Sequence, residues 1–484
     1  MTVKKTVEVI SIQQQARFLT ADMDTPISLF MKAAGAKDGI LLESAEVDGR
    51  WGRFSVLACH TAIYIHCVNN TLALRIDDER LKGLAALEGM PFIEGLRAVM
   101  AALDIQAPSN VPHYENGMPA ITRGIYGYMD FGMAALFSQK LQATMSTEEA
   151  GCAFILPHTV LVFDHLYNRL CQVSLGEHKD LNGAHDSENT VMQGRLTCDT
   201  QSTPIVNMDN VTAVPDAEGY MHNVERIKAM LQQGEAIQVV PSVNFSTDYD
   251  GDAFDLYRRL RRFNPSPYMF YMHLPALTLF GSSPEVMVRC TADRLQLSPI
   301  AGTRKRGATD LEDRELAEEL LADPKERAEH VMLVDLGRND LGRVAKPDSV
   351  NLERFMEIER FSHVMHITSH ITAQLESGLD ALDVLASTFP AGTVSGAPKI
   401  RAMEIIRELE DRPRGPYAGC IGWIGLDKDH VHMDMGITIR SMWHQDGKLN
   451  WQAGAGIVHD SDPQLEWNEV CQKSAIMRLA LVAS

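Results

Sequence analysis

Two pairs of glutamates, far apart in the sequence, have a spacing that suits metal-dependent chemistry. Glu466 and Glu469 lie three residues apart after a glycine-bearing strand, and Glu326 and Glu329 repeat that spacing upstream. Residues three apart on a helix share one face. Two such pairs could meet around one Mg²⁺, which prefers carboxylate oxygens, keeps several waters and commonly shares its shell with an anionic substrate. The glutamates therefore predict an enzyme that acts on a small carboxylic acid.

The composition excludes several classes of partner. The chain has 484 residues, of which 45% are hydrophobic, and its formal net charge is −19. This acidity argues against nucleic acid or an anionic membrane as a partner. The sequence shows no signal-peptide pattern and no run of about 18 apolar residues. We therefore expect a cytoplasmic protein in which a few placed basic residues and a metal attract the anionic substrate.

The eight cysteines are scattered without CxxC pairs, which indicates reduced thiols rather than disulfides or zinc ligands. The segment Ala418-Gly-Cys-Ile-Gly422 faintly resembles the nucleophile turn of a glutaminase. It lacks the first glycine and has the pattern of a strand. We therefore expect Cys420 to be a structural thiol.

The pattern of the chain divides it into three parts. Residues 1–177 alternate short strands and helices, residues 178–214 form a polar loop or linker, and residues 215–484 are again regular. The segment 61–76 predicts a hairpin that turns at its two asparagines. The segment 216–233 predicts an amphipathic helix. Further strands are expected at 237–240, 269–272, 277–280 and 286–290.

The densest motifs lie in the third part. Residues 299–304 predict a strand that ends in a Gly-Thr turn, and Asp323-Pro324 predicts a capped helix start that continues through Asp340. The segment before an expected helix at 400–409 carries amides suited to an anion. Each motif alone has a structural explanation as a turn or a cap, but their joint presence favours a site. The expected anion-binding amides lie near Gly392, Thr393 and Gly396.

These motifs resemble those of the chorismate-utilising enzymes over residues 215–477. The variants resemble the large subunits of anthranilate synthases, and Leu41–Ser44 with Trp51–Ser55 extend the resemblance to the N-terminal part. Several motifs of this length in the family's order leave little room for chance. The segments that carry the match are 299–304, 329–341, 363–366, 389–399 and 453–458.

The resemblance implies a fold and a reaction. The fold would be α+β, with two large packed antiparallel sheets, outer helices and an active site between the sheets. The reaction would be the Mg²⁺-dependent amination of chorismate at C2 by ammonia. Elimination of pyruvate would then give anthranilate, in the first committed step of tryptophan biosynthesis.

The resemblance also assigns roles to individual residues. Glu329 and Glu469 would bind the metal directly, and Glu326 and Glu466 would hold its waters. His366 would transfer protons, Glu285 would lie near the incoming ammonia, and Thr393 would join them in catalysis. The substrate would be bound by Gly302, Thr303, Tyr417, Arg440, Gly454, Gly456 and Lys473, with Arg440 and Lys473 pairing with its carboxylates.

Two positions separate relatives that share this site. Water-adding relatives carry a lysine where this chain has Gln238, and relatives that aminate C4 carry a lysine where it has Ala301. Neither base nor amine nucleophile is therefore available here, which favours direct attack by ammonia. An aminodeoxyisochorismate synthase, or another enzyme of a specialised pathway, remains the alternative. A non-catalytic, tryptophan-sensing scaffold is disfavoured because the expected ligands are all present.

The resemblance further implies a partner and a regulator. Because we identify no glutaminase segment, we expect a separate glutamine amidotransferase subunit to supply ammonia in a hetero-oligomer. The motifs at 41–44 and 264–269 resemble the family's site for inhibition by tryptophan. The residues assigned to that site are Glu43, Ser44, Pro267, Tyr268 and Met269.

Overall fold

The computed structural model describes most of the chain. Trp51, His363 and residues 178–205 of the expected linker lie outside the described residues. The division into residues 1–177, 178–214 and 215–484 stays a prediction. The described ranges are 7–20, 22–33, 38–45, 52–109, 111, 114, 117–145, 150–176, 206–360 and 364–482.

Two large sheets form the centre of the molecule, and they share the long strands β3 and β7. One sheet runs β9-β11-β23-β22-β13-β12-β2-β3-β7-β8-β1, and the other runs from β18 through β15, β14, β21, β20 and β6 to β7, β3 and β4. All of these pairings are antiparallel, and β5 joins β1 in parallel. The predicted α+β architecture is confirmed. The strands are β1 (Ile10–Leu19), β2 (Gly39–Glu43), β3 (Phe54–Val68), β4 (Thr71–Ile76), β5 (Leu103–Gln106), β6 (Gly124–Met129), β7 (Cys152–Asp164), β8 (Arg169–Leu175), β9 (Thr212–Val214), β10 (Gln238–Val239), β11 (Ser242–Asp248), β12 (Tyr268–His273), β13 (Thr278–Ser283), β14 (Val286–Thr291), β15 (Arg294–Leu297), β16 (Ile300–Lys305), β17 (Asn351–Arg360), β18 (Val364–Gln374), β19 (Gly396–Ala397), β20 (Cys420–Gly425), β21 (Met433–Ile437), β22 (Ser441–Gln445) and β23 (Lys448–Gly454).

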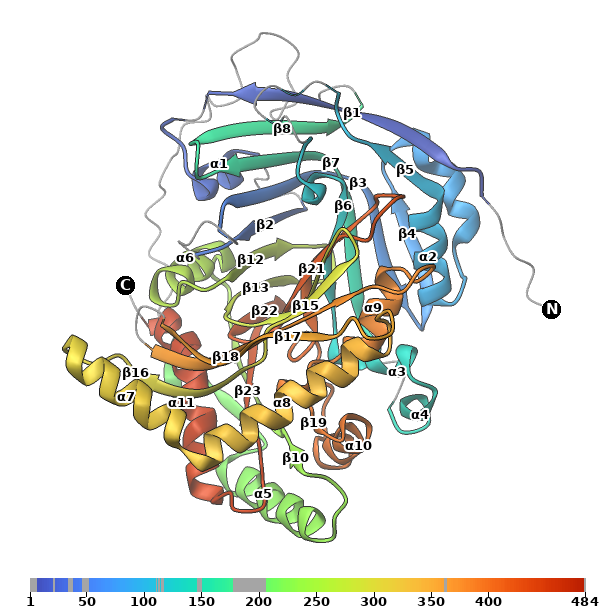
Figure 1. Cartoon of the computed structure of the whole chain (residues 1–484). Helices are drawn as coiled ribbons and strands as arrows, with labels where there is room; N and C mark the ends of the chain where they lie inside the picture. Colours follow the sequence, from blue (N-terminus) through green and yellow to red (C-terminus); the bar gives the residue numbers. More distant parts are fainter. Residues whose placement is uncertain are drawn as a thin grey trace.

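The helices lie outside the sheets, as Figure 1 shows, with α5, α7, α8 and α11 grouped at the side away from β1 and β8. No helix in the described part of the chain is long and apolar enough to cross a membrane. The α-helices are α1 (Pro26–Ala33), α2 (Phe92–Ala102), α3 (Ala134–Phe137), α4 (Gln139–Gln142), α5 (Ala217–Gln232), α6 (Ala253–Phe263), α7 (Asp310–Ala322), α8 (Pro324–Gly342), α9 (Ala381–Thr388), α10 (Lys399–Leu409) and α11 (Pro463–Val482), and the 3₁₀ helices are η1 (Glu79–Leu87), η2 (Ala120–Thr122), η3 (Phe131–Met133), η5 (Met208–Asn210) and η6 (Gly392–Val394).

A local irregularity lets β3 serve both sheets. Its first half pairs with β2 and its second half with β4, and the register with β7 shifts between Thr61 and Ile63. His60, directly before the shift, has a φ of 54°. Bulges of this kind bend a strand and increase its twist. The bend carries one strand from the first sheet into the second.

Strands that precede residue 176 and strands that follow residue 206 meet at one junction in each sheet, β2 with β12 and β6 with β20. β2 lies between β3 and β12, and β6 lies between β7 and β20. The hydrophobic core is correspondingly continuous across both regions. The strands that precede residue 176 are therefore joined to the later strands directly by backbone hydrogen bonds.

Several local predictions are confirmed. The hairpin of β3 and β4 turns at Asn69 and Asn70, whose φ values of 47° and 62° suit a tight hairpin turn. Helix α5 begins after Asp216, whose side chain accepts a hydrogen bond from the amide of Gly219. Helix α8 begins after Asp323, which accepts from two amides of the first turn.

One strand prediction is wrong in part. β16 does not end at the Gly-Thr pair but continues to Lys305, and its register with β18 shifts between Ala301 and Arg304. Gly302 has a φ of 63°, a conformation that glycine adopts at low cost. The pair is therefore a bulge within a strand rather than a terminal turn.

Two buried hydrogen bonds fasten α8 and α11 to the sheets. His330 of α8 lies 2.6 Å, Nε2 to Oγ, from Ser369 of β18, and both residues are fully buried. The indole of Trp451 in β23 donates to the hydroxyl of Ser474 in α11 over 2.8 Å. Burial lowers the pKa of His330 to about 4, so it is neutral at physiological pH. These anchors fix the faces that both helices present to the space between them.

Gly127 tests how tightly the second sheet is packed. A Cβ at this position would overlap the backbone carbonyl of Ala153, so Gly127→Ala should lower the free energy of unfolding by roughly 2–4 kcal/mol. Gly342 has open space around its Cα, and Gly342→Ala is the matched control with an effect of about 0.5 kcal/mol or a slight gain. Denaturant unfolding of both variants measures the difference, and equal stabilities would contradict the packing described.

Candidate active site

A cavity of about 560 Å³ gathers the predicted functional residues. Its walls come from β16, β18 and β23, from α8 and α11, and from the segments around Glu285, Thr393 and Arg440. The volume is within the range of small-molecule sites. Every residue predicted to be catalytic, substrate-binding or metal-binding lines it: Glu285, Gly302, Thr303, Glu326, Glu329, His366, Thr393, Tyr417, Arg440, Gly454, Gly456, Glu466, Glu469 and Lys473.

Four carboxylates face this cavity from two helices. Glu326 and Glu329 lie on α8, and Glu466 and Glu469 lie on α11. Burial raises the pKa of Glu329, a hydrogen bond of 3.2 Å from Gln238 Nε2 opposes the shift, and the negative charges of Glu326 and Glu469 add to it. Burial and the charge of Glu469 likewise raise the pKa of Glu466, which is 8% exposed. The carboxylates are therefore close enough to repel one another.

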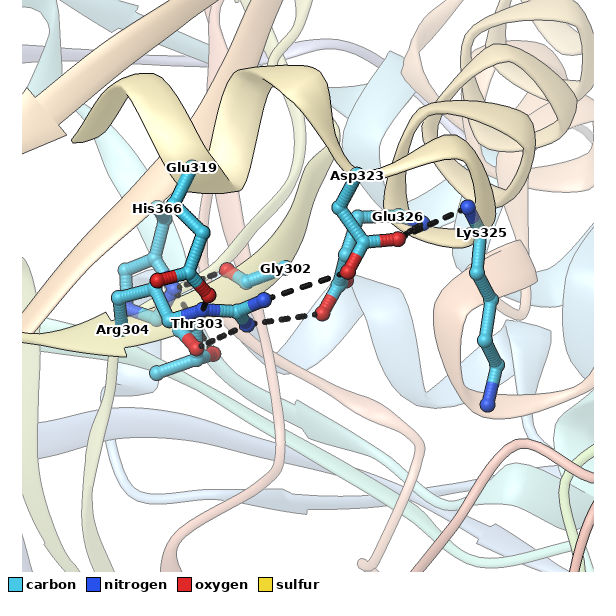
Figure 2. A network of polar contacts seen from close by, with 8 residues as sticks. All are labelled: Gly302, Thr303, Arg304, Glu319, Asp323, Lys325, Glu326 and His366. Atoms are coloured by element: carbon cyan, nitrogen blue, oxygen red, sulfur yellow. Dashed lines mark hydrogen bonds and ion pairs between the residues drawn. The ribbon is translucent and has the colours of Figure 1, made fainter. Parts of the chain in front are cut away.

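Basic side chains compensate part of this charge. Lys473 lies 2.6 Å from Glu469 and also donates to the carbonyl of Gly454. Arg304 of β16 contacts Glu326 at 3.1 Å and reaches Asp323 and Glu319 at the junction of α7 and α8, as Figure 2 shows. Arg304 thus connects β16 to the start of α8. Glu329 and Glu466 have no such ion pair within the described residues.

The donor set fits a hydrated divalent cation. Among the described residues, no three His, Cys, Asp or Glu side chains form a ready-made metal cluster. Mg²⁺ does not need one, because it is usually bound by one or two carboxylates, several waters and an anionic substrate. Glu329 and Glu469, on facing helices, would supply those carboxylates. The mutual repulsion described above is what such a cation would relieve.

His366 is held in one tautomer at the wall of the cavity. Its Nδ1 lies 2.8 Å from the carbonyl oxygen of Gly302 and 3.1 Å from the hydroxyl of Thr303 (Figure 2). Because a carbonyl oxygen only accepts, Nδ1 carries the proton and the lone pair is on Nε2. Burial lowers the pKa of His366, and the Arg440 charge adds to this. A neutral imidazole in this position can accept a proton.

Glu285 and Arg440 also line the cavity. Burial raises the pKa of Glu285 to about 7, against the Thr393 hydroxyl and the positive charges of Arg440 and Lys473. Arg440 has no carboxylate ion-pair partner among the described residues, and burial lowers its pKa. Burial also raises the pKa of Tyr417 to about 12, so the phenol keeps its proton. An unpaired guanidinium beside a phenol and a carboxyl group suits an anionic substrate.

Two glycines keep the floor of the cavity open. A Cβ at Gly456 would lie 2.6 Å from the amide nitrogen of Gln238, and one at Gly454 would lie 2.6 Å from the carbonyl of Pro241. Larger residues would displace Gln238 and the backbone before β11. The glycines therefore permit a close backbone approach to whatever occupies the cavity.

Comparison with known protein families shows to which family the chain belongs. The sequence profile of the chorismate-binding enzymes matches residues 78–478. The chain belongs to the chorismate-binding enzyme family. The predicted resemblance is confirmed, and the cavity described above is the candidate active site of this family member.

Several anthranilate synthase subunits align with nearly the whole chain. Anthranilate synthase component 1 of Aquifex aeolicus is 38% identical over 96% of this chain and 93% of its own length, and that of Pseudomonas putida is 38% identical over 94% and 92%. The crystal structure of anthranilate synthase component I from Streptococcus pneumoniae covers 96% of this chain and 99% of its own, with a TM-score of 0.69 and 31% identity.

A more distant member shares the fold. The menaquinone-specific isochorismate synthase from Escherichia coli superposes with a TM-score of 0.71 at 18% identity, covering 99% of this chain and 96% of its own. The two-sheet architecture therefore persists where most residues differ.

Sequence reasoning missed two contributors to the active site. Lys325 lines the cavity and lies one helical turn before Glu329, so its helix position could have indicated it. Arg414 is buried and binds Glu410 through two nitrogens, with further hydrogen bonds to the carbonyls of Val240 and Val394. Val240 and Val394 line the cavity, and the guanidinium lies over the Tyr417 ring, 5.7 Å from its centroid. No sequence pattern signals this buried clamp.

The residues predicted to bind tryptophan lie away from this cavity. Glu43 and Met269 are register partners in β2 and β12, and the amide of Ala45 donates to the carbonyl of Ser266. Glu43 is 5% exposed and accepts hydrogen bonds from Tyr257 and Arg261. The structure thus brings the two motifs together.

Pro267 and Tyr268, from the second motif, lie at a different place from Glu43. Tyr268 donates to Asp434 and, with Pro267, lines a separate small cavity. Tyr268 therefore faces away from Glu43, as neighbouring residues of a strand do.

The predicted anion site before α10 needs correction. Helix α10 begins at Lys399, whereas Gly392 and Thr393 belong to η6 and Gly396 pairs with Val239 in a short ladder. The glycine amides are therefore not at the N-terminus of α10, although Thr393 lines the cavity. Cys420 lies in β20, fully buried, in agreement with a structural thiol.

The raised pKa of Glu285 predicts a pH-dependent stability difference. The folded state binds a proton between about pH 4.5 and 7 that the unfolded state has lost, so the wild type loses stability as pH rises through this window. Glu285→Gln cannot titrate. The variant should therefore gain roughly 1–3 kcal/mol relative to the wild type between pH 5 and pH 8. Denaturant unfolding at both pH values measures this difference, and a constant difference would refute the shifted pKa.

Proposed function

We propose that this chain is the catalytic large subunit of an anthranilate synthase. It would convert chorismate to anthranilate by adding ammonia at C2 and eliminating pyruvate. The observation that supports this most strongly is the single cavity in which four carboxylates, His366, Arg440 and Lys473 converge. The relatives named above add support, because they align over 94–96% of this chain.

Each basic residue would bind or orient the dianionic substrate. Arg440 offers a planar pair of donors to one carboxylate, and Lys473 offers a point charge to the other. Tyr417 and Thr303 can donate hydrogen bonds from the walls. A substrate carboxylate would supply the ion-pair partner that Arg440 lacks among the described residues.

The acid–base groups would act at two different atoms. Glu285, with its pKa raised to about 7, can take a proton from incoming ammonium so that neutral ammonia attacks C2. His366 can accept a proton on Nε2 when pyruvate is eliminated, because Nδ1 is occupied by the Gly302 carbonyl. Thr393 would orient the Glu285 carboxyl group. The role of His366 depends on its neutral imidazole, and the role of Glu285 depends on its raised carboxyl pKa.

Mg²⁺ would be held by Glu329 and Glu469 directly and by Glu326 and Glu466 through water. When bound, it neutralises the ring carboxylate and favours departure of the 4-hydroxyl. Arg304 and Lys473 hold Glu326 and Glu469 in place. Glu326 and Glu466 would therefore orient the waters around the metal and would not contact the metal itself.

The identity of two wall residues favours amination over hydration. Gln238 donates its amide to Glu329, and a glutamine cannot deprotonate water. Ala301 offers no amine nucleophile beside the bulge at Gly302. Ammonia would therefore attack directly at C2. The alternative, an aminodeoxyisochorismate synthase, differs only in whether the elimination step follows.

Ammonia would come from a partner. The relatives' name, component 1, implies a second component. The proposed partner is a glutamine amidotransferase subunit that delivers ammonia to the Glu285 wall. The enzyme would then be a hetero-oligomer.

Tryptophan would inhibit by binding where β2 meets β12. Glu43 and Met269 are register partners on this strand pair, Ser44 directly follows β2, and Pro267 and Tyr268 complete the second motif. Because β2 connects the N-terminal strands to β12, a ligand here could favour one arrangement of the sheets over another.

Product identification tests the proposed reaction. The purified chain, supplied with chorismate, Mg²⁺ and an ammonium salt, should release anthranilate and pyruvate, detected by chromatography and mass. Glutamine in place of ammonium should yield no product from the chain alone. Accumulated aminodeoxyisochorismate would show that elimination fails, and isochorismate or a 4-amino product would contradict the assignments of Gln238 and Ala301.

Ser44 tests the proposed inhibitor site. Ser44→Phe places a large ring directly after β2. It should raise the tryptophan concentration for half-inhibition at least about tenfold and leave uninhibited turnover within about twofold. Ser44→Ala is the control for loss of the hydroxyl without added volume. Inhibition curves for the three proteins give the comparison, and unchanged sensitivity in Ser44→Phe would place the inhibitor elsewhere.

A further inference from the structure

A second cavity, of about 480 Å³, lies behind the active-site wall. Strands β3, β6 and β7 line it from one sheet, β11, β22 and β23 line it from the other, and the segment 412–416 closes one side. This segment leads directly into Tyr417, which lines the active site instead. The two cavities are therefore separated by residues 414–417 and have no lining residue in common.

The second cavity is also distinct from the proposed tryptophan site. Its lining residues Trp443 and Gln445 lie toward the end of β22, where His444 pairs with Thr278. Glu43 and Met269 are at the opposite end of the same sheet region, near Ser441 and Gly281. No residue assigned to tryptophan lines this cavity.

A carboxyl group in this cavity lacks a counterion. Oδ1 of Asp130 is buried, and no hydrogen-bond partner reaches it within the described part of the chain. The ionisable groups that interact electrostatically with Asp130 are the thiols of Cys67, Cys152 and Cys420 and the phenol of Tyr128. None of these groups can become a cation. A buried carboxylate without a partner is costly. Burial accordingly raises the pKa of Asp130 well above its usual range.

A second polar atom in the same lining is also unsatisfied. Nδ1 of His66 is buried without a hydrogen-bond partner among the described residues, and its ring stacks on Tyr64 at 4.8 Å between centroids. Asp130 and His66 therefore leave hydrogen-bonding capacity unused beside this cavity, which native structures seldom do.

The walls around these groups are aromatic. The rings of Tyr64, Tyr128 and Trp443 line the cavity and are largely buried. Aromatic faces attract organic cations, and a carboxylate supplies the opposite charge. Arg412, the one guanidinium in the described lining, lies in an exposed segment at the side. A carboxyl group surrounded by aromatic rings is the recognition chemistry for an ammonium group on a flat apolar body.

We propose that this cavity is a second ligand site, which takes a small aromatic ammonium ion with Asp130 as its counterion. The ammonium group donates to the Asp130 carboxyl group, and the aromatic body packs against the rings of Tyr128 and Trp443. This assignment does not depend on the reaction catalysed in the first cavity.

Calorimetric titration with 2-phenylethylamine tests the site. The wild-type chain should bind one equivalent, and 2-phenylethanol, which has the same shape without the charge, should bind at least about tenfold more weakly. Asp130→Asn should weaken 2-phenylethylamine binding at least about tenfold. Asp446→Asn, the same charge change in an exposed turn outside the lining, should stay within about twofold. No binding to the wild type, or equal binding to Asp130→Asn, would overturn the proposal.

A measurement on the wild-type chain covers the case in which Asp130→Asn fails to fold. Cys67 lines the cavity and is partly exposed, whereas the similarly exposed Cys471 lies on α11 outside it. Saturating 2-phenylethylamine should slow alkylation of Cys67 by iodoacetamide at least about threefold, as measured by peptide mass mapping. Cys471 should react at an unchanged rate. Equal rates at Cys67 with and without the amine would overturn the proposal.

Discussion

Charge compensation in one partly buried cavity is the constraint on which the structure depends. Four glutamates approach one another from α8 and α11, and burial and mutual repulsion raise the pKa of Glu329 and Glu466. Arg304 and Lys473 neutralise only Glu326 and Glu469. The repulsion that remains at Glu329 and Glu466 is what a cation between the helices would relieve. Arg440, in contrast, is buried without a carboxylate ion-pair partner among the described residues. A metal at the glutamates and an anionic substrate at Arg440 would together complete the charge compensation.

The fold serves this constraint by holding two helices at a fixed separation. Buried hydrogen bonds from His330 and Trp451 fasten α8 and α11 to different sheets, and the sheets themselves are joined through β3 and β7. Arg304 and Arg414 act as internal clamps, one between β16 and α8 and the other between the walls around Tyr417. The N-terminal strands belong to the same sheets. β2 and β12 are therefore connected to the active-site strand β23 by continuous backbone hydrogen bonding.

Local sequence patterns predicted those structural features that depend only on residues close together in the chain. The asparagines of the β3–β4 hairpin, the Asp216 and Asp323 caps and the paired glutamates all carry their signal within a few residues, and the family's motifs supplied the common cavity. The sequence could not show that β16 continues past Gly302, because a Gly-Thr pair suits a turn as well as a bulge. It also could not reveal Arg414 or Asp130. Their significance arises from partners, or the lack of them, on strands and segments far apart in the chain.

The most direct test of the central claim is divalent-cation binding measured without turnover. Mn²⁺, as a spectroscopic substitute for Mg²⁺, is titrated into the chain with chorismate present and every nitrogen donor omitted, and electron paramagnetic resonance counts the free ion. The account predicts one bound ion per chain, with affinity reduced at least about tenfold in Glu329→Gln and Glu469→Gln and unchanged in the exposed control Glu318→Gln. Equal affinity in Glu329→Gln, Glu469→Gln and the wild type would contradict the claim that these helices share one cation.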